Sequence, residues 1–169
     1  MADSKSIFEQ FGFTEIIDEL CDEIRTLYRE DAVPWVIGYS GGKDSTAIVQ
    51  LIWKAIEDLP IEERTKPIHV ISTDTLVENP VVSSWVRRSL DQLQSESIKK
   101  KMPVQAHPLT PTVEDSFWTN LIGKGYPAPR NKFRWCTERM KINPSNRFIR
   151  ETVQANGEAI LVLGTRKAE

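Results

Sequence analysis

The sequence has few of the residues that build disulfide or metal frameworks. Its 169 residues include two cysteines, Cys21 and Cys136, and two histidines. Two cysteines do not form a disulfide framework, and an iron–sulfur cluster, which usually takes four cysteine ligands, cannot be completed from them. Cys21 lies among the apolar positions of an expected helix, where it fits a small buried side chain. The chemistry of Cys136 is left open.

Long apolar segments are also missing. No run approaches the roughly 18 residues that a membrane-spanning helix needs, and residues 1–6 lack the charged-then-apolar order of a signal peptide. The hydrophobic content of 40% is ample for one packed domain. We therefore expect a cytoplasmic, one-domain chain without membrane contact.

The net charge is small, −2, but the two signs are segregated. Residues 1–31 hold nine acidic and three basic side chains, whereas residues 124–150 hold eight basic side chains against Glu138 alone, a balance of +7. Such a stretch attracts a polyanion or a multiply charged nucleotide. DNA contact is one interpretation, but ATP alone would account for several of these charges.

A glycine-rich turn gives the clearest functional signal. The apolar run 35–37 is typical of a buried strand, and three glycines follow it, after which apolar residues return at helical spacing from Ala47 to Ile56. Glycines let the backbone approach a ligand closely, and the first free N–H groups of a helix attract an anion. We therefore expect an anion at this strand–turn–helix junction.

The spacing of the turn excludes the two commonest phosphate-binding loops. A Walker A loop needs a glycine where Ile37 stands and a hydroxyl where Asp44 follows Lys43. The glycines Gly38, Gly41 and Gly42 also fail the spacing of the Rossmann fingerprint. In contrast, residues 40–45 match in all six positions the SGGKDS signature of the PP-loop ATP pyrophosphatases, which they resemble. That resemblance implies a loop gripping the terminal two phosphates of ATP.

The remaining pattern predicts an α/β fold, an open parallel sheet with helices on both faces, similar to the Rossmann-like adenine nucleotide alpha hydrolases. We expect helices over 13–28, 47–56, from 80 onward, 117–122 and from about 145, and strands over 35–37, 68–71, 102–107 and 159–163. An N-terminal helical region (1–33) and a long basic loop (123–141) complete the domain 1–169. Trp85 and the strand 159–163 are expected to be buried, and His69 to be a core or sheet-face residue rather than a catalyst.

The carboxyl ends of parallel strands form the ligand site of such a sheet. Asp74 is expected there as a ribose or metal-water ligand, or alternatively as the cap of the next helix. Lys43, Arg166 and part of the basic loop would converge on a triphosphate, with Mg²⁺ held by Asp44 or Asp74. The expected nucleotide-binding set is Ser40, Gly41, Gly42, Lys43, Asp44, Ser45, Ser72, Thr73, Asp74, Gly164 and Arg166, with Lys43, Asp44 and Arg166 catalytic.

The loop cations have two interpretations, substrate or DNA contact and plain solvation; they are Arg130, Lys132, Arg134 and Arg139. Cys136 lies next to Arg134 and near Arg139, an electropositive setting that favours the thiolate. A thiolate can carry sulfur or bind iron.

Five stretches carry a narrower resemblance: residues 34–46, 70–80, 125–130, 133–144 and 163–169. They look like the DndC and SspD sulfurtransferases of bacterial DNA phosphorothioation, in the PAPS-reductase-like branch of PP-loop enzymes. The resemblance implies hydrolysis of ATP to AMP and pyrophosphate, adenylation of a DNA backbone phosphate, and sulfur from a cysteine desulfurase that works with other phosphorothioation proteins.

For Cys136 the resemblance implies a ligand of a [4Fe–4S] cluster, with the other ligand cysteines further along a longer chain of which these residues would be a fragment. Two alternatives stay open. A PAPS or adenylylsulfate reductase would share the loop but needs a nucleophilic cysteine near the chain end. A non-catalytic nucleotide-binding subunit would dock partners through the basic loop.

Overall fold

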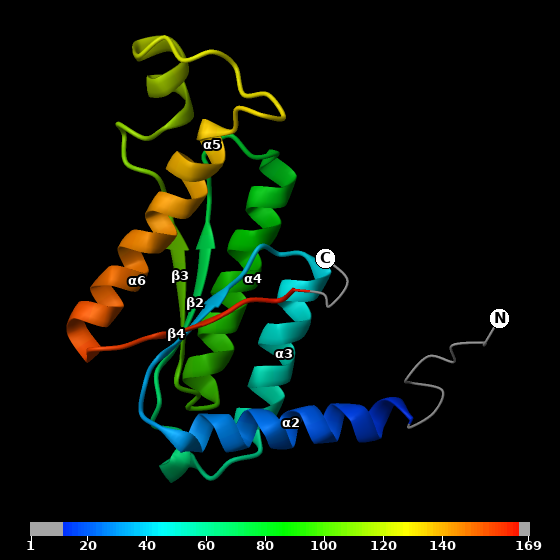
Figure 1. The fold of residues 1–169 in the computed structure, drawn as a ribbon. Coiled ribbons are helices and arrows are strands. Elements are labelled where there is room, and N and C mark those ends of the chain that lie inside the picture. Colours follow the sequence, from blue (N-terminus) through cyan, green and yellow to red (C-terminus); the bar gives the residue numbers. More distant parts are fainter. Residues whose placement is uncertain (1–11, 166–169) are drawn as a thin grey trace, which may run out of the picture.

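The computed structural model describes residues 12–165, and its centre is a parallel sheet (Figure 1). Within this part of the chain the sheet has four strands in the order β3-β2-β1-β4. The strands are β1 (Trp35–Gly38), β2 (Ile68–Thr73), β3 (Val104–Leu109) and β4 (Ile160–Val162). All three neighbouring pairs are parallel, so the predicted open parallel α/β sheet is confirmed.

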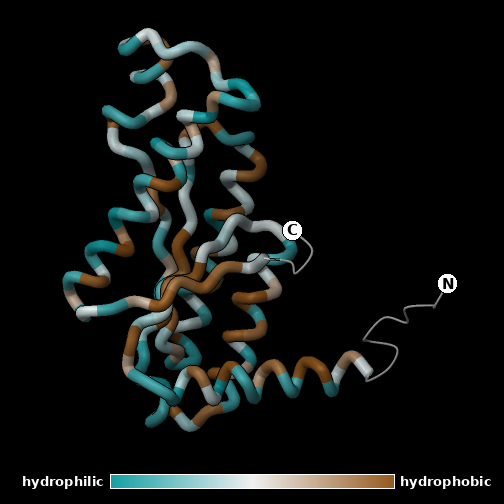
Figure 2. The backbone as a smooth tube through the Cα atoms, viewed as in Figure 1, coloured by the Kyte–Doolittle hydropathy of each residue, from teal (hydrophilic) through white to brown (hydrophobic). Residues whose placement is uncertain are grey.

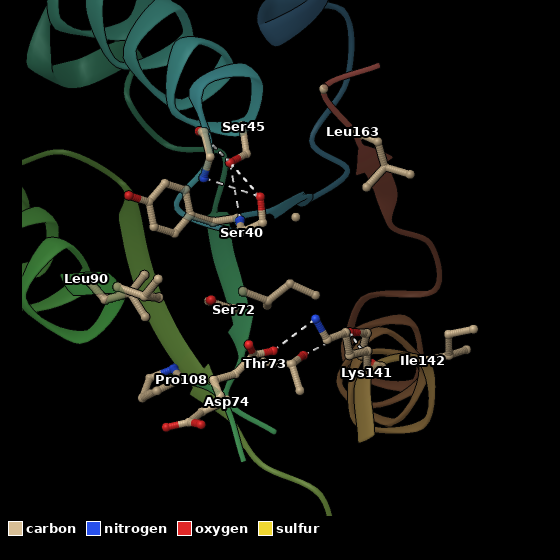
Figure 3. Close-up of a pocket in the computed structure, with 18 of the residues that line it drawn as sticks. Ser40, Ser45, Ser72, Thr73, Asp74, Leu90, Pro108, Lys141, Ile142 and Leu163 are labelled. Atoms are coloured by element: carbon tan, nitrogen blue, oxygen red, sulfur yellow. Dashed lines mark hydrogen bonds and ion pairs between the residues drawn. The ribbon is translucent and has the colours of Figure 1, made fainter. Parts of the chain in front are cut away.

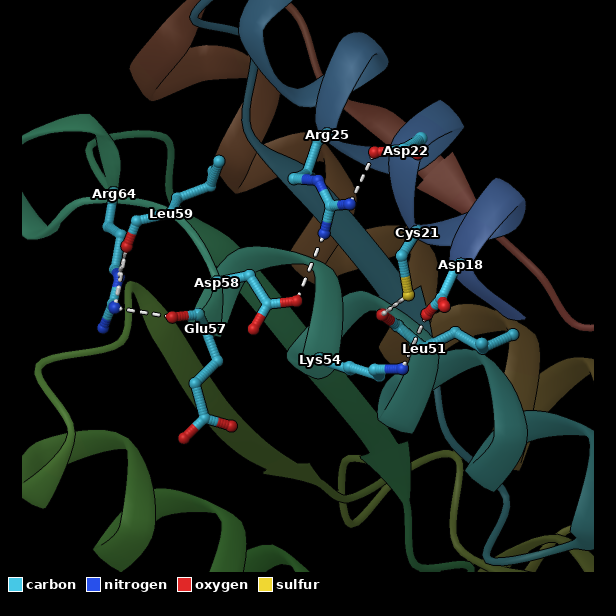
Figure 4. A network of polar contacts seen from close by, with 10 residues as sticks. All are labelled: Asp18, Cys21, Asp22, Arg25, Leu51, Lys54, Glu57, Asp58, Leu59 and Arg64. Carbon is cyan, nitrogen blue, oxygen red and sulfur yellow. Dashed lines mark hydrogen bonds and ion pairs between the residues drawn. The ribbon is translucent and has the colours of Figure 1, made fainter. Parts of the chain in front are cut away.

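Helices cover both faces of the sheet. The chain runs outward from β1 through β2 to β3 and then returns to β4, so right-handed connections place α3 (Lys43–Glu57) and α4 (Pro80–Lys99) on one face and α6 (Asn143–Asn156) on the other. The first described helix, α2 (Phe13–Glu30), packs against α3. Ion pairs link the two helices at Asp18–Lys54 and, beyond the end of α3, at Arg25–Asp58 (Figure 4).

The core lies between the sheet and the α3–α4 layer. Parallel register aligns Trp35 with Ile68 and Ile68 with Val104, so these side chains share one face and meet Ile52 and Ile56 of α3. Figure 2 shows hydrophobic residues along the central strands. Cys21 belongs to the buried set, as expected, with 1% of its surface exposed.

The opposite face carries the two histidines. His69 of β2 and His107 of β3 lie in neighbouring strands, and the His69 Nδ1 and His107 Nε2 atoms are 3.1 Å apart. Phe148 of α6 contacts both rings. His69 is therefore a residue of the sheet face, as predicted.

Two burial predictions are wrong. Trp85 is 61% exposed, because the buried stripe of α4 passes through Val86, Leu90 and Leu93 and leaves Trp85 on its flank. The segment expected as a buried strand forms β4, which pairs with β1 alone among the described strands, and Leu161 there is 49% exposed.

Residues 112–134, here called the arm, project beyond the carboxyl ends of the strands (Figure 1). The arm contains a π-helical turn, η2 (Thr119–Gly123), and then irregular chain, as predicted for a loop. Helix resumes at Trp135, ten residues before the expected Ser145: α5 (Trp135–Thr137) and the π-turn η3 (Glu138–Ile142) lead directly into α6. Cys136 therefore lies on a helix.

The one remaining short element is η1 (Ile61–Glu63), a 3₁₀ turn between α3 and β2. None of the helices in the described part of the chain is long and apolar enough to cross a membrane.

Candidate nucleotide-binding site

A cleft of about 960 Å³ opens at the carboxyl ends of the strands. Its walls come from the turn after β1, the end of β2, the first half of α4 and the junction of η3 with α6 (Figure 3). The cleft thus lies where an open α/β sheet places its ligand, because the strand ends and the loops that follow them converge there.

The turn between β1 and α3, residues 39–42, forms one wall of the cleft, and glycine is required at one position within it and at one position packed against the start of α3. Gly41 has a φ of 73°, and a Cβ there would lie 2.7 Å from Val86 Cγ2 of α4. A Cβ on Gly164, beyond β4, would lie 3.0 Å from the backbone oxygen of Asp44. These glycines allow α4 and the chain after β4 to close directly around the turn.

Serine hydroxyls brace this turn from within. The Ser45 hydroxyl donates to the Gly42 carbonyl at 3.1 Å and accepts from the Ser40 N–H at 3.2 Å, and the two serine Oγ atoms are 3.1 Å apart. Ser45 is 8% exposed. Both serines were predicted to bind the nucleotide, and the structure gives their hydroxyls partners within the turn.

Lys43 and the start of α3 provide positive charge for an anion. Lys43 lines the cleft as the first residue of α3, is exposed, and forms no ion pair with any residue of 12–165. The first N–H groups of the helix have no intrahelical acceptor, and the helix dipole places its positive end there. A phosphate group at the start of α3 would be bound by the free N–H groups and attracted by the positive end of the dipole.

The end of β2 forms the second wall. Ser72 is buried, and the Thr73 and Ser145 hydroxyls lie 3.3 Å apart, which joins β2 to α6 across the cleft. Asp74 accepts hydrogen bonds from the Leu76 N–H at 2.9 Å and the Ser83 hydroxyl at 2.8 Å. Asp74 thus holds the turn after β2 and also lines the cleft, but it is not the cap of α4, because the N-cap residue of that helix is Asn79. Its role as a ribose or metal-water ligand stays a prediction.

Two cations that line the cleft, Lys141 and Arg87, were not predicted from the sequence. Lys141 Nζ lies 3.0 Å from Glu78 Oε1, an ion pair that joins η3 to the turn before α4. Arg87 of α4 also lines the cleft, with its guanidinium 3.9 Å from Asp74 Oδ2. Lys141 was counted in the basic stretch, but nothing in its spacing set it apart from the neighbouring cations.

The predicted convergence of the basic loop on the triphosphate is not observed. Arg130, Lys132, Arg134 and Arg139 are absent from the cleft wall, where Lys141 and Arg87 stand instead. Arg139 is engaged inside the arm, 2.9 Å from Asp115 and 2.9 Å from the Tyr126 hydroxyl. The arm follows the end of β3 and leads into α5, so it lies beyond the carboxyl ends of the strands (Figure 1).

Metal ligands do not gather in the described residues. No group of three or more histidine, cysteine or acidic side chains there could hold a metal ion. Cys136 is half-buried on α5, and Cys21 lies under α3 with its sulfur 4.0 Å from the Leu51 carbonyl. These residues do not fit a [4Fe–4S] cluster. For Mg²⁺ they offer single carboxylates at the cleft, Asp44 and Asp74, so phosphate oxygens and water would supply the other ligands.

Arg166, predicted as catalytic, lies outside the described residues. The chain leading to it is placed, since Gly164 and Thr165 line the cleft.

Fold and site together define an α/β domain with a cleft at the carboxyl ends of its parallel strands and a glycine turn after the first strand. A family model, the phosphoadenosine phosphosulfate reductase domain, matches residues 34–169. The chain therefore belongs to this family.

Three known proteins are similar to this chain. An uncharacterized protein of Methanocaldococcus jannaschii, MJ0066, is 27% identical over 149 residues, which cover 86% of this chain and 25% of that protein. Phosphoadenylyl-sulfate reductase from Candida auris, in a phosphate complex, superposes with a TM-score of 0.52 at 18% identity over 99% of this chain and 71% of that one. The U34-tRNA thiolase NcsA from Methanococcus maripaludis, with its [4Fe–4S] cluster, gives 0.51 at 15% identity over 89% and 45%.

The chain thus spans a quarter of the curated relative that it matches. The two solved structures share the fold, at identities too low to carry more than that.

Proposed function

We propose that this domain binds ATP in the cleft, cleaves it between the α- and β-phosphates, and transfers the adenylyl group to a backbone phosphate of DNA. The observation that carries the proposal is Lys43, a lysine with no ion-pair partner among the described residues, at the first turn of α3 beside a glycine turn that closes on α4. The volume of the cleft suits a nucleotide.

The position of Lys43 and of the helix start determines which bond of ATP would be cleaved. The terminal two phosphates rest on the N–H groups of residues 41–45 and on Lys43, which leaves the α-phosphorus facing the cleft. An oxygen of the acceptor phosphate forms a bond to that phosphorus while the bond to the bridging oxygen of the pyrophosphate breaks. Positive charge on the departing oxygens lowers the barrier, because negative charge develops there.

The DNA acceptor is supported by sequence resemblance and by the cations around the cleft. The outer sulfur of a persulfide on a cysteine desulfurase partner would then attack the activated phosphorus and displace AMP. A thiol reductant would cleave the remaining S–S bond, which leaves the sulfur on the DNA phosphate and the carrier cysteine as a mixed disulfide. Lys141 and Arg87 are placed to contact the acceptor or the α-phosphate. In this proposal any iron–sulfur cluster is completed by residues other than the described ones.

A second candidate, reduction of a sulfonucleotide, is favoured by the family match itself. That chemistry needs a cysteine nucleophile at the nucleotide, and neither Cys21 nor Cys136 lines the cleft. The described residues therefore support nucleotide binding in this alternative without supplying its nucleophile.

The test is the product pattern from ATP. The full-length protein with Mg²⁺, its partners and DNA should yield AMP and pyrophosphate, and Lys43→Ala should lower the rate by about 100-fold, as expected for loss of a group that stabilises developing charge. The matched control is Lys101→Ala, an exposed lysine at the other end of the sheet.

Three results would contradict the proposal. ADP and orthophosphate as products would place the cleavage at the wrong bond. Preferential binding of phosphoadenosine phosphosulfate with release of sulfite would favour the reductase. ATP affinity without any turnover in the complete system would identify a non-catalytic nucleotide-binding subunit.

A further inference from the structure

The arm is built around a stack of aromatic rings that ends at the surface. Trp135 is buried, and its ring stacks on Phe117 with ring centroids 5.5 Å apart. Phe117 in turn meets the edge of Trp118 at 5.2 Å, and Trp118 is 59% exposed. An exposed tryptophan held this way is already ordered, so a ligand that stacks on it loses little conformational entropy of the protein.

A second aromatic side chain stands on a tight turn of the arm. The backbone groups of Arg130 and Phe133 exchange two hydrogen bonds, of 3.0 and 2.8 Å, around the two residues between them. Phe133 is 43% exposed on this turn. It stands between Lys132 and Arg134 in the chain, so an exposed ring is flanked on both sides by cations.

These cations lack acidic partners. Arg130, Lys132 and Arg134 are exposed and form no ion pair with another residue of 12–165. The acidic residues of the arm are Glu114 and Asp115, and Asp115 is already paired with Arg139. The arm therefore carries both cations without acidic partners among the described residues and exposed aromatic rings.

We propose that the arm binds a single-stranded segment of nucleic acid, with unpaired bases stacked on Phe133 and Trp118 and backbone phosphates on Arg130, Lys132 and Arg134. Bases are available for stacking when they are unpaired, whereas the cations alone would suit a duplex equally well. This inference rests on the proposed function, because it specifies the form in which the acceptor reaches the cleft.

The arm is well situated to present the acceptor. The chain leaves it at Trp135 and reaches the cleft wall at Lys141 within two helical elements, α5 and η3. A strand held on the arm would thus extend toward the nucleotide, and the stacked bases would fix which backbone phosphate arrives there.

The experiment measures binding, so it does not depend on turnover. Fluorescence anisotropy of the full-length protein with a labelled 15-mer of thymidine, its ribo counterpart and a matched duplex should show the single strand bound more tightly than the duplex. Phe133→Ala and Trp118→Ala should each weaken single-strand binding by about tenfold, while Phe133→Tyr retains it. Ile122→Ala is the matched control, since Ile122 is 75% exposed on the same arm but cannot stack.

Salt dependence tests the phosphate contacts separately. Lys132→Ala and Arg134→Ala should each reduce the slope of log affinity against log salt by about 0.7, the value for one phosphate of a single strand. Comparison of the deoxy and ribo strands tells which nucleic acid the arm prefers.

Equal affinity for duplex and single strand, with Phe133→Ala without effect, would overturn the inference. A loss as large for Ile122→Ala as for Phe133→Ala would also overturn it, because that pattern describes an apolar protein-docking surface. Pyrophosphate release measured on the same samples separates this failure from failure of the proposed function.

Discussion

Some cations at the carboxyl ends of the strands are paired, as Lys141 is with Glu78, but others there differ from the buried Lys66 at the amino ends in having no acidic partner among the described residues. At the amino ends of the strands, Lys66 is 3% exposed and paired with Asp31 at 2.7 Å, and Arg64 donates to the Glu57, Leu59 and Lys100 carbonyls. At the carboxyl ends, Lys43 has no ion-pair partner among the described residues, and the three arm cations Arg130, Lys132 and Arg134 likewise have none.

The difference in pairing indicates which cations stabilise the fold and which are available to a ligand. A cation whose donors are all satisfied by the protein holds the fold together and offers nothing to a ligand. A cation that the fold leaves without a partner gains most from an anion that arrives later. If the proposed function holds, the carboxyl ends of the strands form the binding end of the sheet, and the amino ends, with their paired cations, form its structural end.

The largest effects are expected when one lysine at each end of the sheet, Lys66 or Lys43, is replaced by alanine. Lys66→Ala removes the ion pair with Asp31, the bond to the Leu27 carbonyl and the ammonium 5.1 Å from the Trp35 ring, and should lower the free energy of unfolding by about 2 to 3 kcal/mol. ATP affinity of the folded fraction should be unchanged. Lys43→Ala should leave the free energy of unfolding unchanged and should lower ATP affinity. Urea unfolding and calorimetric titration measure both, and a Lys66→Ala protein that folds normally but loses ATP would break the comparison.

Two glycines sharpen the contrast at the binding end. Gly41→Ala forces a side chain into a φ of 73° and against Val86, whereas Gly125→Ala meets the same kind of φ, 68°, with nothing within 4 Å. We expect Gly125→Ala to cost about 1 kcal/mol of stability and to leave ATP affinity intact. Gly41→Ala should cost more and weaken ATP binding at least about tenfold, because α4 must move from the phosphate loop. Equal affinities of the two variants would show that the loop geometry is not needed.

The smallest effect concerns the histidines between the two ends. Burial lowers the pKa of His69 and of His107 below the ordinary 6.5, and for His107 the neighbouring His69 adds to the effect. Since the unfolded chain then binds more protons, this stability is present above pH 6.5 and is lost as the pH falls below it.

Thermal unfolding followed from pH 7.5 to 5 should show this loss, and His107→Asn should flatten the profile. An unchanged slope in the variant would assign the acid sensitivity to other groups. ATP affinity of the folded protein should not follow the same profile, since neither ring lines the cleft.

Local sequence patterns were enough to predict the elements that have a clear hydrophobic period or an adjacent glycine turn. The strand at 35–37, the helix after residue 43 and the buried Cys21 all appear where the sequence predicts them. The side-chain cap of α4 is similarly local, since Asn79 accepts from the Val81 N–H at 2.9 Å and Pro80 begins the helix.

Burial and ion pairing could not be predicted in the same way. Trp85 looks like a core residue by type and spacing, yet the side of α4 that packs against the core passes through Val86, Leu90 and Leu93 and leaves Trp85 61% exposed. Lys141 and Arg139 are two residues apart in one basic stretch, but the first lines the cleft and the second is held by Asp115 in the arm.

The sequence by itself determined the order of strands and helices and the presence of a glycine turn with a lysine at a helix start, because hydrophobic period and backbone freedom act over a few residues. The tertiary structure decided which cations remain without a partner, because an ion pair joins residues such as Lys141 and Glu78 that are distant in sequence. Only folding brings such residues together, and so only folding separates the binding end of the sheet from its structural end.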